Sequence, residues 1–413
     1  MKKFLVAFVC CMSLVPHTAV GASEHREVGE SDDLPDEPSL SISSKPSDLE
    51  LEDLAFVAEQ FWMSTKDAVR EYGWRDNFSL VLSEIANNHP DDFARGEMSD
   101  GAIAMVAFDR KQPENTKQLL KEFQSAFPHV AISVQTNVGY TSVEINEAVI
   151  DIHGNVMARP GVTDAVTVFS PTDNTIQVDV SVESRDAKLS ENLLTRELHR
   201  AEVATVPAPV SVEVKVFEGV KLADTESSAF HYGGEDLNSC TSGFGVRWGS
   251  STSGERGIST AAHCPNSLTD DGKTLTYRGG HQGHFGDFQW HSGTGTESDD
   301  FYSGNSSTTE VHRRDVSSVA AAAPGSVVCV NGRTTHKSCT TVREQQVCAN
   351  GACNLVGMQH HVTAGGDSGG PWFYGPVAYG IHHGYYRSWF RRRSAFSHAT
   401  LMDNAIGVHV ATN

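Results

Sequence analysis

The spacing of apolar residues divides the chain into two parts with different secondary structure. From Leu49 to about Ala86, apolar side chains recur at every third or fourth position, which predicts two amphipathic helices. From His231 to the end, helical spacing is almost absent, and short apolar runs stand between Gly- and Ser-rich turn segments. This second pattern is typical of an all-β sandwich or barrel.

The segment between them, residues 101–219, mixes both periodicities and predicts an α+β unit. The expected strands are Ala102–Phe108, Val130–Val134, Ala165–Phe169, Thr175–Val182 and Val210–Phe217. One clear helix is expected at Thr116–Phe127 and another at Ala187–Glu202. Residues 222–230 are then expected to be an exposed, cleavable linker.

The all-β part contains strand-like runs and one helical segment. The runs include Gly243–Trp248, Gly325–Val330 and Val377–His382. Near the end, Ala399–Ala405 predicts a terminal helix before an apolar strand at Ile406–Val410. A part of this length is large enough to bury a substantial core.

The first 48 residues carry a targeting signal and a polar leader. A basic start, an apolar run to Val15 and small residues up to Ala22 form the layout of a secretory signal peptide over residues 1–22. The apolar run is too short to span a membrane. Residues 23–48 are rich in Ser, Glu, Asp and Pro, so we expect a disordered acidic leader. The protein is therefore expected to be secreted, or periplasmic in a Gram-negative cell.

Charge follows the same division. The whole chain carries a net charge of −20, but residues from Ser227 onward contain 13 basic and 14 acidic side chains. Almost all of the negative charge therefore belongs to the N-terminal part. A basic surface for nucleic acid is not expected, and the two parts are predicted to have different fates.

Cysteines are also unevenly placed. Two of the eight lie inside the signal peptide, and the other six are Cys240, Cys264, Cys329, Cys339, Cys348 and Cys353. An even number in an exported chain predicts disulfides, although spacing alone leaves 15 connectivities open. The acidic part contains none once the signal is removed.

The candidate nucleophile is Ser368, in the stretch Gly365–Trp372. A serine hydroxyl needs a base and an anion-stabilising pocket to react. Glycines around it allow strained turns and let a carbonyl approach backbone N–H groups. The expected oxyanion-hole donors are the N–H groups of Gly366 and Ser368.

The expected base is His263, which follows a run of small side chains and precedes Cys264. A third group must hold the imidazole in the correct tautomer. Asp287 is preferred because it opens a β-type run with a tryptophan three residues later. Asp300, in a polar turn-like segment, is the competitor.

The order His263, Asp287, Ser368, with the motifs Thr260–Cys264 and Gly366–Pro371, resembles the chymotrypsin-like serine proteases. Within that family it is similar to the exported bacterial branch that includes alpha-lytic protease and the streptogrisins. The resemblance covers nearly all of residues 231–413. It implies two six-stranded antiparallel β-barrels, over residues 227–318 and 319–413, with a catalytic triad between them.

The resemblance also implies the disulfides Cys240–Cys264 and Cys329–Cys339, which leaves Cys348 and Cys353 to each other. By position, Asp367 would be a buried carboxylate that shapes the oxyanion loop. Some relatives give this carboxylate a basic partner where this chain has Val330, so its partner here is open.

Residues 49–226 are similar to the pro-regions of that branch. In the family such a region assists folding of the protease and occupies its active site until cleaved. Partners expected from the resemblance are therefore a peptide or protein substrate and the chain's own pro-region, with a monomeric mature enzyme. A permanent binding domain is the alternative.

Substrate preference is inferred from the strand that would pair with an extended peptide. The residues expected to contact substrate are Gly365, His382, His383, Gly384 and Tyr385. His382 lies where glutamate-specific relatives place a histidine that can donate to a substrate carboxylate. The resemblance thus suggests a preference for acidic residues before the cut, although relatives have serines where this chain has Gly365 and Tyr385.

Other functions remain as alternatives. Residues 366–370 also match the G-x-S-x-G elbow of α/β-hydrolases, but no βαβ pattern precedes them and only 45 residues follow Ser368. Several histidines cluster without a metalloprotease or paired C-x-x-C motif, so no metal or other cofactor is expected. An inactive protease-like binding module would typically lack a triad residue.

Overall fold

The computed structural model describes residues 42–183, 206–225, 236–249, 254–270, 273–292, 300–304, 312–388 and 391–412. The expected signal peptide, residues 23–41 of the expected acidic leader and the expected helix at 187–202 lie outside these residues. No helix among the described residues is long and apolar enough to cross a membrane.

The N-terminal region begins with three helices where the sequence pattern predicted two. The five helices of the region are α1 Asp48–Gln60, α2 Thr65–Tyr72, α3 Arg75–Asn88, α4 Glu114–Ala126 and α5 Ser142–Met157. The first predicted helix is interrupted because the Ser64 side chain accepts a hydrogen bond from the Asp67 N–H and starts α2. Helix α5 was missed, although Thr141 and Glu144 form a capping box that marks its start.

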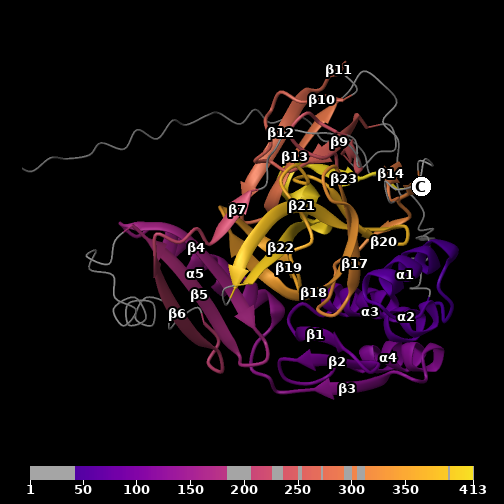
Figure 1. Cartoon of the computed structure of the whole chain (residues 1–413). Helices are drawn as coiled ribbons and strands as arrows, with labels where there is room; N and C mark the ends of the chain where they lie inside the picture. Colours follow the sequence, from indigo (N-terminus) through magenta and orange to yellow (C-terminus); the bar gives the residue numbers. More distant parts are fainter. Residues whose placement is uncertain are drawn as a thin grey trace, which may run out of the picture. The chain divides into compact units, whose positions relative to one another are not determined.

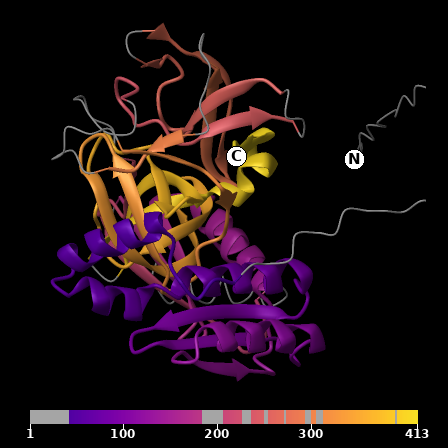
Figure 2. The same cartoon turned by 90° about the vertical axis from the view of Figure 1, so that its right-hand side faces the viewer.

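The strands of the N-terminal region form two groups. They are β1 Phe93–Ser99, β2 Ile103–Phe108, β3 Ala131–Gln135, β4 Val162–Ser170, β5 Thr175–Val182, β6 Ser211–Glu218 and β7 Ala223–Thr225. Strands β1–β3 make one sheet, along which α3 and α4 lie (Figure 2). All five predicted strands of this segment are present, and β1 was missed.

The second group of strands, β4–β6, continues a sheet of the C-terminal part. β4 pairs antiparallel with β18, so that Thr167 lies opposite Cys348. Figure 1 shows β4–β6 extending from the strands of the barrel. The N-terminal region is thus joined to the C-terminal part by backbone hydrogen bonds as well as by side-chain packing.

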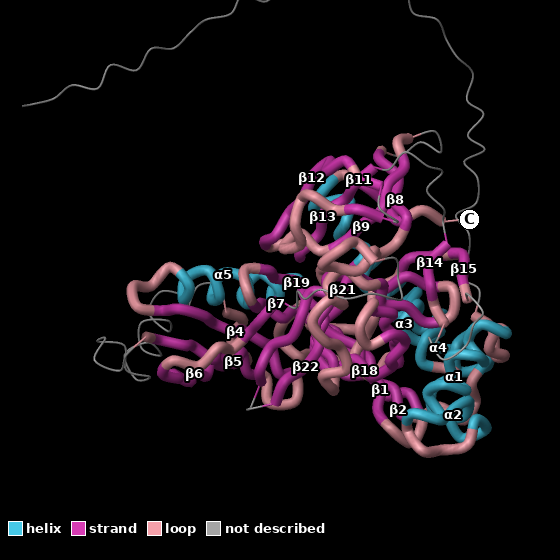
Figure 3. The backbone as a smooth tube through the Cα atoms, turned by 45° about the horizontal axis from the view of Figure 1, so that its top comes forward, coloured by secondary structure: helices cyan, strands magenta, loops and turns pink. Residues whose placement is uncertain are grey.

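The C-terminal part is built almost entirely of strands, as Figure 3 shows. Its first half contains β8 Gly245–Trp248, β9 Arg256–Thr260, β10 Thr269–Asp270, β11 Lys273–Thr274, β12 Thr276–Gly283, β13 Gly286–Ser292, β14 Asp300–Tyr302 and β15 Arg313–Asp315. Its second half contains β16 Ser318–Val319, β17 Val327–Gly332, β18 His336–Ala349, β19 Ala352–Met358, β20 Pro371–Tyr374, β21 Val377–Ser388, β22 Arg391–His398, η1 Ala399–Leu401, α7 Met402–Ile406 and β23 Val408–Val410.

The second half closes into a six-stranded antiparallel barrel. Its strand order is β17-β20-β21-β22-β19-β18, and β17 pairs again with β18 to close the ring. The sheet of the first half has the order β12-β13-β9-β8-β23 among the described residues. The predicted all-β class, with an α+β region before it, is therefore confirmed.

Strand β23 corrects one detail of the predicted organisation. The sequence interpretation assigned residues 319–413 to the second barrel, but Val408–Val410 pairs with β8 of the first sheet. An alternating apolar pattern identifies a strand without specifying its partner. Part of the expected linker at 222–230 is also a strand, because β7 pairs with β21. Residues 226–230 are not among those that the structure describes.

The N-terminal helices share a core with the second barrel. Leu54 and Val57 of α1 and Tyr72 of α2 belong to the same buried apolar cluster as Phe373 and Tyr379 of the barrel. Burial of this apolar surface stabilises the contact between the two regions.

A buried acid in this contact predicts a pH dependence of stability. Asp76 of α3 accepts a hydrogen bond from the Tyr379 hydroxyl. Burial raises the pKa of the Asp76 carboxyl from 3.8 to about 7, although the Tyr379 hydrogen bond lowers it. Because the pKa of Asp76 is raised in the folded state, the contribution of the protonated carboxyl to the free energy of unfolding is present below pH 4 and is lost as pH rises through 7.

We therefore expect Asp76→Asn to stabilise the full-length chain at pH 8 by up to about 4 kcal/mol and to have little effect at pH 4. Thermal unfolding of the uncleaved chain at both pH values would measure this. The exposed substitution Asp91→Asn is the control and should change neither melting temperature. Equal effects of Asp76→Asn at the two pH values would contradict the assignment.

Candidate active site

The loop before β20 holds Ser368 through backbone turns that depend on glycine. Gly366 and Gly369 have φ values of +102° and +89°, in the left-handed region. A Cβ on Gly366 would lie 2.6 Å from Thr334 Oγ1. Ser368 itself is buried, and its carbonyl accepts a hydrogen bond of 2.7 Å from the Thr241 N–H.

Asp367 fixes the same loop from inside. Its Oδ1 accepts from the N–H groups of Thr334 at 2.8 Å and Thr335 at 3.2 Å. Its Oδ2 accepts from Ala364 N–H at 2.8 Å and Thr335 Oγ1 at 2.5 Å. The carboxylate is fully buried and accepts hydrogen bonds from its own loop and from the turn between β17 and β18, so its partners here are not basic side chains.

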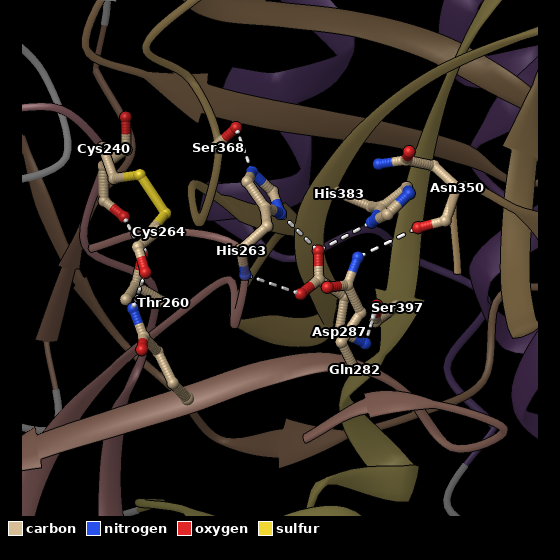
Figure 4. Close-up of polar contacts among 12 residues, drawn as sticks. Cys240, Thr260, His263, Cys264, Gln282, Asp287, Asn350, Ser368, His383 and Ser397 are labelled. Atoms are coloured by element: carbon tan, nitrogen blue, oxygen red, sulfur yellow. Dashed lines mark hydrogen bonds and ion pairs between the residues drawn. A yellow bond between two sulfur atoms is a disulfide. The ribbon is translucent and has the colours of Figure 1, made fainter. Parts of the chain in front are cut away.

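His263 lies between Ser368 and Asp287 (Figure 4). Its Nε2 is 2.8 Å from Ser368 Oγ, and its Nδ1 is 2.5 Å from Asp287 Oδ2. The His263 N–H also donates to Asp287 Oδ1 at 3.1 Å. The carboxylate thus fixes both the ring and the backbone of the histidine.

Three separate elements bring these residues together. His263 follows β9, where the disulfide Cys240–Cys264 links the adjacent residue to a distant loop. Asp287 lies in β13, and its N–H donates to Ser397 Oγ of β22 at 2.9 Å. The competitor Asp300 lies in β14, where it pairs with Asp315 of β15. The carboxylate in contact with the His263 ring is that of Asp287.

The other two disulfides are Cys329–Cys339 and Cys348–Cys353. The first joins β17 to β18 across directly opposite residues, and the second connects the ends of β18 and β19. All three pairings expected from the sequence are present.

His383 is a second imidazole on Asp287. Its Nδ1 lies 2.7 Å from the same Oδ2 that contacts His263, and the His383 side chain is fully buried. Burial by itself raises the pKa of Asp287, but the two histidines outweigh burial and hold this pKa well below its ordinary value. The sequence placed His383 on the substrate strand, and nothing in its local pattern indicated this contact.

His382 points to the other side of β21 and contacts Trp372. The Trp372 Nε1–H donates to His382 Nδ1 at 3.3 Å, and both side chains are fully buried. The indole also stacks on Phe396, with ring centroids 5.1 Å apart. An indole is only a donor, so His382 Nδ1 must accept and its ring proton lies on Nε2. Sequence reasoning did not identify Trp372.

The remaining predicted substrate residues lie around the same strand. The Tyr385 ring is 5.2 Å from that of His361, and the Arg392 guanidinium lies over it at 4.7 Å. The Gly365 carbonyl accepts from Thr334 Oγ1 at 2.7 Å. Gly384 lies at the point where β21 meets β7.

Strand β7 of the chain itself pairs with the expected substrate strand. The pairing is antiparallel, with Thr225 opposite Gly384 and Asp224 opposite Tyr385. Added strands bind in this way, through backbone hydrogen bonds at the edge of a sheet.

Among the described residues, one group of three side chains has the spacing to bind a metal ion. His263, Asp287 and His383 each offer one ligand atom, and these atoms lie within 4.8 Å of one another. They are also the atoms that form the short hydrogen bonds described above. The donor set is therefore already used by the protein, and we assign it no metal.

No family model matches this chain. It is 32% identical over 165 residues to glutamyl endopeptidase 2 of Streptomyces griseus, a match that covers 37% of this chain and 81% of the relative.

Two solved structures are also similar. A glutamic acid-specific serine protease that uses a histidine triad in substrate binding is 28% identical, with 44% of this chain and 96% of that chain covered and a TM-score of 0.36. Thermobifida fusca protease A is 24% identical, with 46% and 98% covered and a TM-score of 0.34.

Proposed function

Because this chain belongs to the chymotrypsin-like family of serine proteases that includes glutamyl endopeptidase 2, we propose that it is a secreted serine endopeptidase made as an inactive precursor. The hydrogen-bonded series Ser368, His263, Asp287 is the observation that carries the proposal. Such a series has the parts needed to activate a serine hydroxyl.

In the proposed reaction, Ser368 Oγ attacks the carbonyl carbon of the peptide bond while His263 Nε2 takes the hydroxyl proton. Asp287 keeps the Nδ1–H tautomer and stabilises the imidazolium that forms. The oxyanion would accept from the N–H groups of Gly366 and Ser368. The Gly366 N–H has no hydrogen-bond acceptor among the described residues, which supports this role.

Collapse of the tetrahedral intermediate breaks the C–N bond, and His263 gives its proton to the leaving amine. Water then attacks the acyl-enzyme, with His263 again as the base, and releases the acid product and Ser368. The substrate would lie as an added strand on β21, where β7 lies in the uncleaved chain.

We further propose that residues 49–226 are a pro-region and that the protease begins at Ser227. Their acidic charge and lack of cysteines support separate fates for the two parts. The register of β7 also supports the boundary, since the described pairing with β21 reaches Thr225 and the proposed cut follows Glu226, the next residue in the sequence.

His382 supports a preference for acidic residues before the cut. With Nδ1 accepting from Trp372, the ring proton lies on Nε2, and Nε2–H would be the group that donates to a carboxylate oxygen of the substrate. The relative glutamyl endopeptidase 2 is named for cleavage at glutamyl residues, which agrees with this preference.

Trp372→Phe tests how His382 is held. Phenylalanine keeps the stacking on Phe396 but removes the indole donor, so the ring proton can move from Nε2 to Nδ1. We expect kcat/KM for substrates with glutamate before the cut to fall about tenfold, with little change for alanine substrates. The exposed Trp248→Phe is the matched control. Equal losses on both substrates would indicate a packing role only.

An organophosphonate probe for serine hydrolases tests the proposed activity. It should label the processed wild-type protein at Ser368 and fail to label Ser368→Ala. An inactive protease-like binding module would not be labelled in either form. Equal labelling of both forms would contradict the assignment of the nucleophile.

A further inference from the structure

Helix α1 places a buried carboxylate against β15, β18 and the turn between β20 and β21, far from Ser368 in sequence. Asp53 is fully buried, and its Oδ2 accepts from Arg314 Nη1 and from the Gly375 N–H, each at 2.7 Å. Its Oδ1 accepts from Lys337 Nζ at 2.7 Å. All three donors belong to the proposed protease unit, whereas Asp53 belongs to the proposed pro-region.

The donors come from three elements of the protease part. Arg314 lies in β15, Lys337 in β18 and Gly375 in the turn between β20 and β21. The Phe373 ring lies under both cations, 5.6 Å from the guanidinium and 5.9 Å from Nζ. The Gly375 carbonyl also accepts from Arg314 Nη1 at 3.3 Å. These contacts lie within the proposed protease unit and do not involve α1.

Arg314 has more donors than Asp53 uses. Its Nε is buried and makes no hydrogen bond among the described residues. The Nη2 has an ion-pair contact of 3.1 Å with Glu52, whose side chain is 44% exposed. An anion with more oxygens than one carboxylate could therefore be bound by this group.

We propose that Arg314, Lys337 and the Gly375 N–H form an oxyanion-binding site of the protease, which Asp53 fills in the precursor and a phosphate or carboxylate group fills after the pro-region leaves. The inference rests on the proposed removal of that region. Two neighbouring cations lose their counterion when α1 departs, so an oxyanion that replaces Asp53 gains two charge-assisted contacts.

Thermal unfolding of the mature enzyme tests the site with inorganic phosphate as the probe. We expect 50 mM phosphate to raise the melting temperature by roughly 3–5 °C over sodium chloride of equal ionic strength. Lys337→Met should lose most of this shift, and the exposed Lys273→Met should keep it. Because phosphate stabilises proteins in general, the difference between these two variants is the readout. Equal shifts in both would overturn the site.

The same measurement on the uncleaved precursor tests the site without depending on protease activity. In the Ser368→Ala background, Asp53 fills the site and phosphate should give no specific shift. Asp53→Ala in that background should create the shift, whereas Glu52→Gln should not. Absence of a shift in the Asp53→Ala precursor would overturn the site even if the probe labels Ser368. Failure of labelling with a shift present would reject the proposed activity alone.

Discussion

Replacing Ser368 with alanine is expected to abolish peptidase activity, with a fall in kcat of about a millionfold. The loss is this large because His263 and Asp287 act only through the hydroxyl, 2.8 Å from His263 Nε2. If the enzyme removes its own pro-region, the same variant should also stay at full precursor length. Hydrolysis of a peptide substrate and the mass of the purified chain measure the two effects.

The matched control is Ser125→Ala, an exposed serine of α4 in the proposed pro-region, which should be processed as the wild type is. The mature wild-type protein should begin at Ser227, which intact mass and N-terminal sequencing would show. Cleavage of Ser368→Ala in a preparation free of other proteases would contradict self-processing. A different first residue in an active wild-type enzyme would contradict only the proposed boundary.

Local patterns predicted much of the fold and the three side chains that form the hydrogen-bonded series Ser368, His263, Asp287. The α+β strands follow apolar alternation, and Asp287 was preferred to Asp300 because its β-type run would pack in the sheet. In the structure that run is β13, whose residues are all buried. Helix α2 was not separated from its neighbours because its apolar pattern is short and continues the patterns beside it. Strand β1 was missed.

The contacts that the sequence did not reveal join residues far apart in the chain. Asp53 meets Lys337 across 284 positions, and His383 meets Asp287 across 96. A histidine beside another histidine, or an aspartate in an amphipathic helix, has the same local pattern whether it is solvated or buried against a partner. Only tertiary packing brings Asp53 to Arg314 and Lys337, and His383 to Asp287.

Asp287→Asn is expected to lower kcat about ten-thousandfold at neutral pH. In the wild type, Oδ2 lies close to the Nδ1 atoms of both His263 and His383, while Oδ1 accepts the His263 N–H. An asparagine has one carbonyl oxygen and one NH2 group. If the NH2 group replaces Oδ1, it faces the His263 backbone N–H, and if it replaces Oδ2, it faces the Nδ1 atoms of both histidines. In either orientation His263 loses its position or its tautomer.

The control for this loss is Asp300→Asn, which removes the competing carboxylate of β14 and should leave kcat within about twofold of the wild type. Folding can be checked separately, because the organophosphonate probe should still label Asp287→Asn slowly at Ser368. A similar loss in both variants would mean that charge near the cleft matters more than the position of one carboxylate. A loss confined to Asp287→Asn would show that the hydrogen bonds to His263 set the rate, since both variants remove one negative charge.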